Sequence, residues 1–238
     1  MCTTTNTSTD WQIENVQVKV DMCTLDNALD NSYAQHLLSG KSLPISYNTF
    51  VSQLQTAPAG DKVLINVSRA LTRLKSVFVT LQKDSTNGVS RKFWNNFYSP
   101  AYNENKTAMA YDKNGEFEFQ IQIGSKLFPE YPIRSHAEAY YQLCKCLGVQ
   151  ASSVHNFDIN AKEYRSAKFV LGTDCEKVLD AGFTGINTRA GDLMSVRFNY
   201  ANGNISGSDG GRLADRLHIV LHSDQILEIR DSGCQVFD

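Results

Sequence analysis

The chain has 238 residues, of which 42% are hydrophobic and 20% charged, an ordinary globular composition that argues against a disordered chain. Its 23 basic and 25 acidic residues give a formal net charge of −2, which excludes a generally basic nucleic-acid coat and gives no attraction to anionic lipid. No apolar run approaches the length of a membrane span, and the first residues lack the basic start and apolar stretch of a secretory signal.

The N-terminal quarter predicts one strand and one helix. Val16–Met22 alternates apolar and polar residues, as a strand with one buried face does. Residues 26–38 carry apolar side chains at helical spacing and precede Gly40, so they predict a helix. Small residues with Pro and Gly follow at 55–61, and we place a domain boundary at this hinge.

Beyond the hinge, short candidate strands alternate with turn signals. Phe117–Ile123 has the clearest period-two alternation and follows the tight-turn signal Asn114-Gly115. The other predicted strands are residues 63–67, 74–81, 168–171, 193–200, 217–221, 226–229 and 235–237. Many short strands separated by glycine-containing turns predict an all-β protein, either a sandwich or a barrel.

A second helix is predicted to interrupt the strands. Pro129 and Pro132 fix an extended link before it, and Ser135 with Glu138 forms a capping box at its start. Gly148 supplies the stop signal. The residues predicted to face the core are Ala137, Tyr140, Tyr141, Cys144 and Leu147.

Residue spacing gives no support for a reactive site. His218 and His222 are four apart, but on a strand such residues stand roughly 13 Å from each other, too far to share a metal ion. Cys144 and Cys146 would lie on nearly opposite sides of a helix. The glycine-rich range 202–211 lacks the Lys and Ser or Thr of a phosphate loop, and no Gly-x-Ser-x-Gly motif occurs. We therefore predict no catalytic, cofactor-binding or metal-binding residue, no cofactor, and no enzyme.

Two weaker patterns concern binding. Aromatic and basic residues are interleaved at 91–98, a pattern typical of single-stranded nucleic-acid binding, although an aromatic loop packed over a sheet edge explains it better in a chain of acidic balance. Basic residues predominate between 62 and 92, and acidic residues between 174 and 238. This asymmetry suits contacts between like subunits, and it equally suits a solvated face.

Four ordered motifs carry a resemblance to a known family. They are Ile65–Thr80, Ile121–Lys126 continuing through 129–135 and its helix, Phe183–Asp192, and the ending from Leu217 to Asp238. Together they resemble the double jelly-roll major capsid proteins, most nearly those of polinton-like viruses, adintoviruses and their relatives integrated in eukaryotic genomes. The resemblance covers residues 11–238.

The resemblance implies an all-β fold, a jelly-roll β-sandwich with one or two short helices in the connections. Members of the family carry two jelly rolls in one chain, and this chain is too short for both. We therefore predict that residues 1–60 are an N-terminal arm, the tail of a preceding jelly roll plus the hinge, and that residues 61–238 form the jelly-roll domain. Deleting residues 1–56 should then leave the β-sheets intact.

The resemblance also implies a structural function. We expect a capsid subunit that self-associates as a homotrimer, meets neighbouring capsomers and tiles an icosahedral shell, with no membrane insertion and no sequence-specific nucleic-acid binding. It would be made in the cytoplasm or nucleus of a host cell and reside in the virion. Two alternatives stay open. One is a jelly-roll carbohydrate-binding module in which Trp94 and Tyr98 stack on sugar rings, and the other is a cupin-type enzyme, which needs a clustered His and acid site.

Overall fold

The computed structural model describes residues 12–57, 62–82, 97, 99, 117–148, 159–166, 168–176, 185–189, 193–200, 214 and 216–238. The chain divides into two units. The smaller consists of Met1–Tyr47 with Gln225–Phe237, and the larger of Asn48–Asp224 with Asp238. Strands β1 and β8 each contribute residues to both units.

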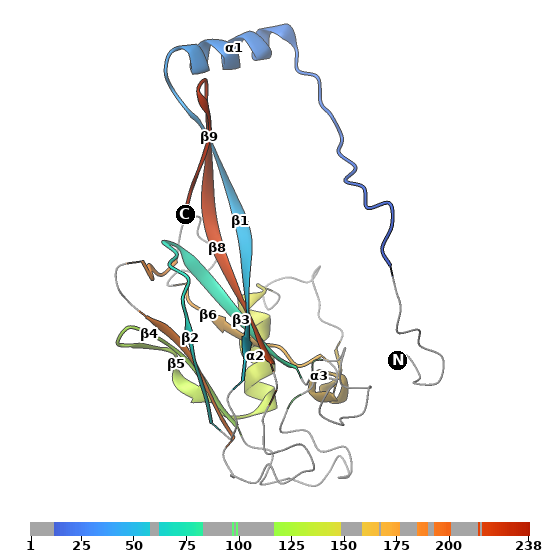
Figure 1. Ribbon diagram of the computed structural model, residues 1–238, viewed down its shortest axis with the longest axis vertical. Coiled ribbons are helices and arrows are strands. Elements are labelled where there is room, and N and C mark those ends of the chain that lie inside the picture. Colours follow the sequence, from blue (N-terminus) through green and yellow to red (C-terminus); the bar gives the residue numbers. More distant parts are fainter. Residues whose placement is uncertain are drawn as a thin grey trace. The chain divides into compact units, whose positions relative to one another are not determined.

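Two antiparallel sheets build the larger unit (Figure 1). The first has the order β1-β8-β3-β6, formed by Leu43–Thr56, Arg216–Arg230, Leu74–Gln82 and Leu171–Asp174. The second has the order β2-β7-β4-β5, formed by Lys62–Val67, Met194–Tyr200, Phe117–Ile123 and Lys126–Ile133. The short helix α3, Ala161–Ser166, precedes β6 in the chain.

The pairing of these strands defines a jelly roll. Each strand pairs with the one equally far from the other end of the series, so β1 pairs with β8, β2 with β7, β3 with β6 and β4 with β5. This is the arrangement of a long hairpin that is folded over into two facing sheets. The described residues thus confirm the predicted all-β jelly-roll sandwich.

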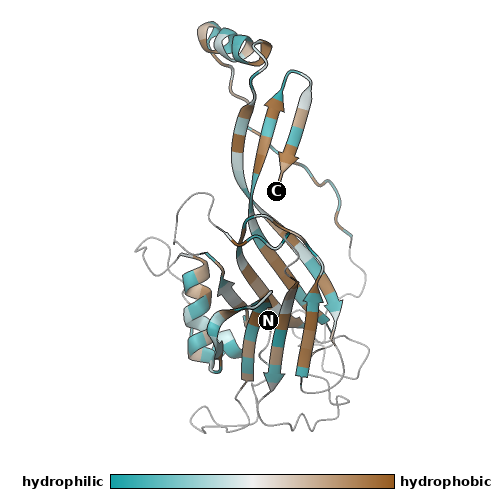
Figure 2. Ribbon diagram, turned by 90° about the vertical axis from the view of Figure 1, so that its left-hand side faces the viewer, coloured by the Kyte–Doolittle hydropathy of each residue, from teal (hydrophilic) through white to brown (hydrophobic). Residues whose placement is uncertain are grey.

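The core follows from period-two alternation along the strands, which Figure 2 shows as alternating hydrophobic and hydrophilic bands. Strand β4 buries Phe117, Phe119 and every second residue after them, and between these lie half-buried polar residues. Phe117 stacks on Phe198 of β7, with ring centroids 5.5 Å apart. Each large apolar side chain buried in this way contributes about 1.5–3 kcal/mol, so this stack is a major part of the core.

Helix α2, His136–Cys146, begins where the capping signal predicts. The Ser135 hydroxyl accepts a hydrogen bond from the Glu138 amide (3.2 Å), and the Glu138 carboxylate accepts one from the Arg134 amide (3.1 Å). The predicted inward face is wrong in part. Ala139 and Leu143 are the buried residues and Tyr141 is 54% exposed, whereas Tyr140 is partly buried against the core as predicted.

Close approach to strand β6 decides which face of α2 is buried. A Cβ atom on Gly172 would lie 3.1 Å from the Leu143 Cα and 3.2 Å from the Cys146 sulfur. The missing side chain at Gly172 therefore lets the helix backbone lie directly on the sheet. This contact turns Leu143 and Cys146 toward β6. Helical spacing along α2 alone does not predict that these two residues face the sheet.

The smaller unit holds helix α1, Asn27–Leu38, and the hairpin of β8 with β9, Gly233–Phe237. The helix confirms the prediction for residues 26–38; Asp26 caps its start, and Gly40 follows its end with φ +78°. None of the residues of α1 is buried. In this unit, no apolar side chain of the described residues is buried.

Several sequence predictions need correction. Residues 16–22 form no strand, because they have no partner strand among the described residues. The residues around Pro129 and Pro132 form strand β5 at the edge of its sheet, rather than a link. The predicted strand at 168–171 lies three residues later, as β6, and the predicted strands at 217–221 and 226–229 are one strand, β8.

The predicted boundary between residues 1–60 and 61–238 does not match the two compact units. Residues 48–56 of β1 belong to the larger unit, and β1 pairs with β8 in the jelly roll. Deleting residues 1–56 would therefore remove an edge strand of the sandwich, contrary to the expectation that it would leave the sheets intact. The turn signal Asn114-Gly115, the range 202–211 and most of 91–98 lie outside the described residues.

Candidate functional site

An apolar groove lies on the first sheet, between helix α2 and strands β1, β3 and β8. It has a volume of about 530 Å³, and its lining includes Phe50, Phe78, Leu143, Leu147 and His222. Strand pairing places Phe78 and His222 on neighbouring strands, because β3 and β8 are hydrogen-bonded partners. The groove lies within the larger unit and is the main concave feature that we consider as a functional site.

An aromatic stack forms one wall of the groove. The rings of Phe50 and His222 are nearly parallel, with centroids 4.6 Å apart. The Nδ1 atom of His222 is 3.1 Å from the hydroxyl of Ser76. Burial lowers the pKa of His222 from its usual 6.5, and the positive charge of Lys75 lowers it further, so the ring is neutral at pH 7.

Two further titratable side chains line the groove, Cys146 and Lys168. Burial raises the pKa of the Cys146 thiol far above its ordinary value, and the negative charge of Asp174 adds to the effect. Since the thiolate is the reactive form, this cysteine is not an activated nucleophile. Lys168 also lines the groove, and its Nζ atom is 3.4 Å from a carboxylate oxygen of Glu163. The lining of the groove is mostly apolar, which suits it to apolar contact.

A charged cluster lies on the same sheet. Lys75 lies between two acids, with its Nζ atom 3.1 Å from Glu176 and 3.7 Å from Asp224. Burial disfavours the charge on Lys75, but hydrogen bonds and attraction from the two carboxylates outweigh it and raise the pKa. The cluster holds its own charges in place and leaves this lysine protonated.

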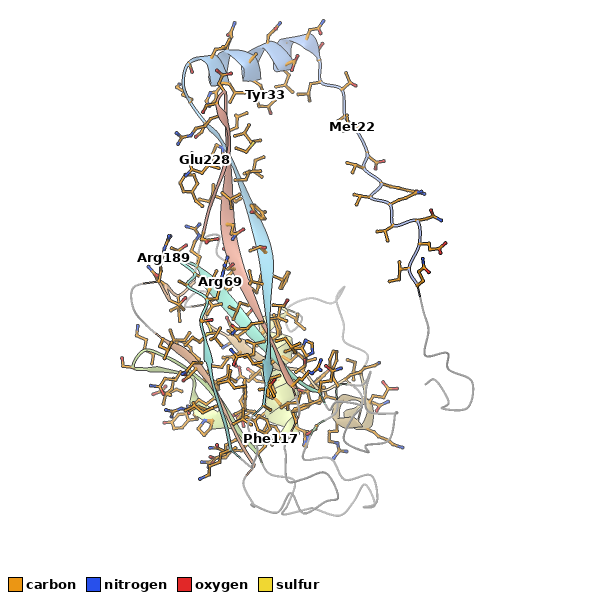
Figure 3. The ribbon with its side chains drawn as sticks, in the orientation of Figure 1. Met22, Tyr33, Arg69, Phe117, Arg189 and Glu228 are labelled. Atoms are coloured by element: carbon orange, nitrogen blue, oxygen red, sulfur yellow. The ribbon has the colours of Figure 1, made fainter. Side chains whose placement is uncertain are left out.

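His136 occupies a second aromatic environment, at the start of α2. Its Nε2 atom is 2.6 Å from the hydroxyl of Ser99, and its ring packs edge-on against Phe117 (labelled in Figure 3) and Phe169. Burial lowers the pKa of His136 to about 4, and the charge of Arg165 contributes. Packed in this way, His136 acts as a structural residue of the core edge.

The structure separates the residues that the sequence analysis weighed as metal ligands. His218 and His222 both lie on strand β8, as predicted, and they contact different partners, Gln82 and Ser76. Cys144 and Cys146 lie on α2, and Cys146 alone of the two lines the groove. Among the residues that the structure describes, no group of three His, Cys, Asp or Glu side chains could hold a metal ion. None of the helices in this part of the chain is long and apolar enough to cross a membrane.

Sequence reasoning missed the groove because it missed β1. The range 43–56 contains no charged residue and places Ile45, Tyr47 and Val51 at even spacing, which is a usable strand signal. Phe50 lies on the opposite face of that strand, and its packing on His222 joins positions 172 residues apart. Only the pairing of the strands brings two such positions together.

Comparison with known proteins gives similarity at the level of the fold. No protein-family model matches the sequence, and no curated protein matches it. The chain is similar to the structure of PBCV-1 VP54 fitted into a cryo-EM reconstruction of the virophage Sputnik, with a TM-score of 0.47 and 12% identity over 90% of this chain and 55% of that chain. A quasi-atomic model of the PBCV-1 virus capsid gives a TM-score of 0.39 and 10% identity over 86% of this chain and 54% of that chain.

The chain thus spans about half the length of the two viral capsid structures that it matches. The described residues hold one jelly roll, and the strand order of its two sheets is what establishes that fold.

Proposed function

We propose that this chain is a structural subunit of a viral shell, built by self-association of jelly-roll sandwiches. The observation that carries the proposal is the combination of an eight-strand jelly roll with apolar side chains that stay exposed in the described part of the smaller unit. In the smaller unit no described apolar side chain is buried, although the unit includes a twelve-residue helix and a hairpin. Surfaces of this kind favour contact with other subunits.

The proposal extends to a closed assembly. We propose that copies form homotrimers, that these capsomers meet one another in an icosahedral shell, and that the protein resides in the virion. Closed rotational symmetry is the usual outcome when one chain presents a surface and its complement to identical copies. The protein would then act through its shape and contacts, without catalytic turnover, membrane insertion or sequence-specific recognition of nucleic acid.

The test is the mass and shape of the purified full chain. Light scattering after size-exclusion chromatography should give a discrete species of three chains, and negative-stain images should show ring-shaped particles. A species of six chains with a ring outline would support the shell and correct the number of subunits. A monomer at all concentrations that binds glycans on an array would contradict the proposal and favour the carbohydrate-binding alternative. An enzymatic activity of the purified chain that is lost on a single His or Asp substitution would also contradict the proposal.

A further inference from the structure

Residues 16–22, which precede helix α1, have the pattern of a strand but no partner strand among the described residues. Val16, Val18, Val20 and Met22 alternate with polar residues and are each between 71% and 91% exposed. Figure 3 shows the segment that leads to Met22 as an extended trace with side chains along it. Residues 16–22 include neither Pro nor Gly, so every backbone amide is available for a sheet hydrogen bond.

The larger unit presents a matching edge. Strand β1 is the first strand of its sheet, and β8 is its only strand neighbour in the part of the chain that is described. Its residues 48–56 contain no charged side chain and no proline. Natural proteins protect free edges with lysine or proline, as β5 does at the edge of the other sheet with Lys126, Pro129 and Pro132. Residues 48–56 of β1 have no such protection.

The side chains on this edge are also apolar and open. Phe50 is 62% exposed and Leu54 is 51% exposed, and both occupy even-numbered positions of β1, so they share one face. Phe50 also lines the apolar groove. A strand added beside β1 with its valines on this face would extend the apolar surface from Leu54 toward the groove.

We propose that residues 16–22 of one copy of this chain add as an edge strand to residues 48–56 of a second copy. In the described part of each copy, one strand-like segment has no partner and one sheet edge is unprotected, so exchange between copies satisfies both in every chain. The contact is heterologous, since the donor and acceptor surfaces differ. Such contacts form a ring where the rotation between copies closes, and an open filament where it does not. The inference goes beyond the shell function and does not need it, because strand exchange would serve any assembly of this chain.

The first experiment measures association of full-length variants by sedimentation velocity. Val18→Ser with Val20→Ser should raise the dissociation constant about a hundredfold, since two buried valines are lost. The matched control, Gln17→Ser with Lys19→Ser, changes the opposite face of the same segment and should shift the constant less than threefold. Equal weakening by both pairs, or no weakening by the first pair, would overturn the proposal.

The acceptor is tested in the same assay. Leu54→Lys places a charge on the proposed edge and should weaken association at least tenfold, because charged edge residues block strand addition. Leu64→Lys, at an equally open position on β2, is the control and should leave association within threefold of the starting protein. If Leu64→Lys weakens association as much as Leu54→Lys, the effect is one of surface charge and the acceptor is wrong.

Hydrogen exchange then identifies the occupant. Amides in both segments, 16–22 and 48–56, should become protected as the protein concentration rises, and the valine variant should lose this protection. Protection that is already complete in the monomer would show that residues 16–22 pair within their own chain, and it would overturn the assignment to a second copy. Ring-shaped particles with both segments unprotected would overturn strand exchange while leaving the proposed shell function standing.

Discussion

Replacing Gly185 with alanine tests the closest backbone approach at any of the described glycines. A Cβ atom at this position would lie 2.7 Å from the carbonyl carbon of Arg73 and 2.9 Å from its Cα. Non-bonded carbon atoms pack at about 3.5–4.0 Å, so the added methyl group requires one of the two backbones to move by about 1 Å. A flexible side chain could give way, but here the obstacle is main chain.

The movement is costly because hydrogen bonds join the two backbones. Leu74 and Ile186 exchange amide-to-carbonyl bonds of 3.0 and 2.9 Å, and two residues later the Thr188 amide donates to the Leu71 carbonyl at 2.8 Å. Weakening the first two bonds costs about 1 kcal/mol each. Overpacking strain adds about 1–3 kcal/mol. We therefore expect Gly185→Ala to lower the free energy of unfolding by about 3–5 kcal/mol, and the melting temperature by about 6–20 °C in a chain of this length.

Urea denaturation and thermal melting, both followed by circular dichroism, measure the change. Gly148→Ala is the control, because its Cβ meets nothing within 4 Å and only the positive φ of +66° opposes it. That strain costs about 1 kcal/mol. The reasoning fails if Gly185→Ala lowers the free energy of unfolding no more than Gly148→Ala does, since the two backbones would then move apart at little cost. In Figure 3, the labels Arg69 and Arg189 locate the two chain segments that these hydrogen bonds join.

Three further predictions concern other contacts of the described residues. Thr188→Val removes the hydroxyl that accepts from the buried Leu71 amide at 2.9 Å and should cost about 1–3 kcal/mol in urea denaturation, whereas Thr188→Ser, which keeps the hydroxyl, should cost less than half as much. Leu143→Ala should lower the free energy of unfolding by about 2–4 kcal/mol because Leu143 packs on the sheet. Tyr141 is exposed, so Tyr141→Ala should change that free energy by less than about 0.5 kcal/mol. A larger loss for Tyr141→Ala than for Leu143→Ala would support the helix face that the sequence predicts. Acidification from pH 7 to pH 4 should remove about 3 kcal/mol of stability through His136, because the unfolded chain takes up the proton near pH 6.5 and the folded chain only near its lowered pKa of about 4. His136→Gln should flatten that part of the stability profile in denaturation at stepped pH, and an unchanged slope would show that other groups carry it.

The sequence alone determined most of the local structure. Period-two alternation located β4, because a strand with one buried face must alternate, and short β candidates between turn signals located β2, β3 and β7. The capping box at Ser135 located the start of α2, because the hydroxyl satisfies an amide that the helix leaves unpaired. These signals depend on neighbours within a few residues. They were accurate wherever such neighbours decide the conformation.

The tertiary structure decided what local pattern cannot express. Residues 16–22 alternate as cleanly as β4 but form no strand, since a strand exists only when a partner offers hydrogen bonds. The buried face of α2 was set by the glycine at position 172, which admits the helix backbone. The groove beside Phe50 depends on His222, far away in the chain, and no spacing rule connects them. Periodicity states that a face will be buried, whereas the approach of distant backbone determines which face it is and what covers it.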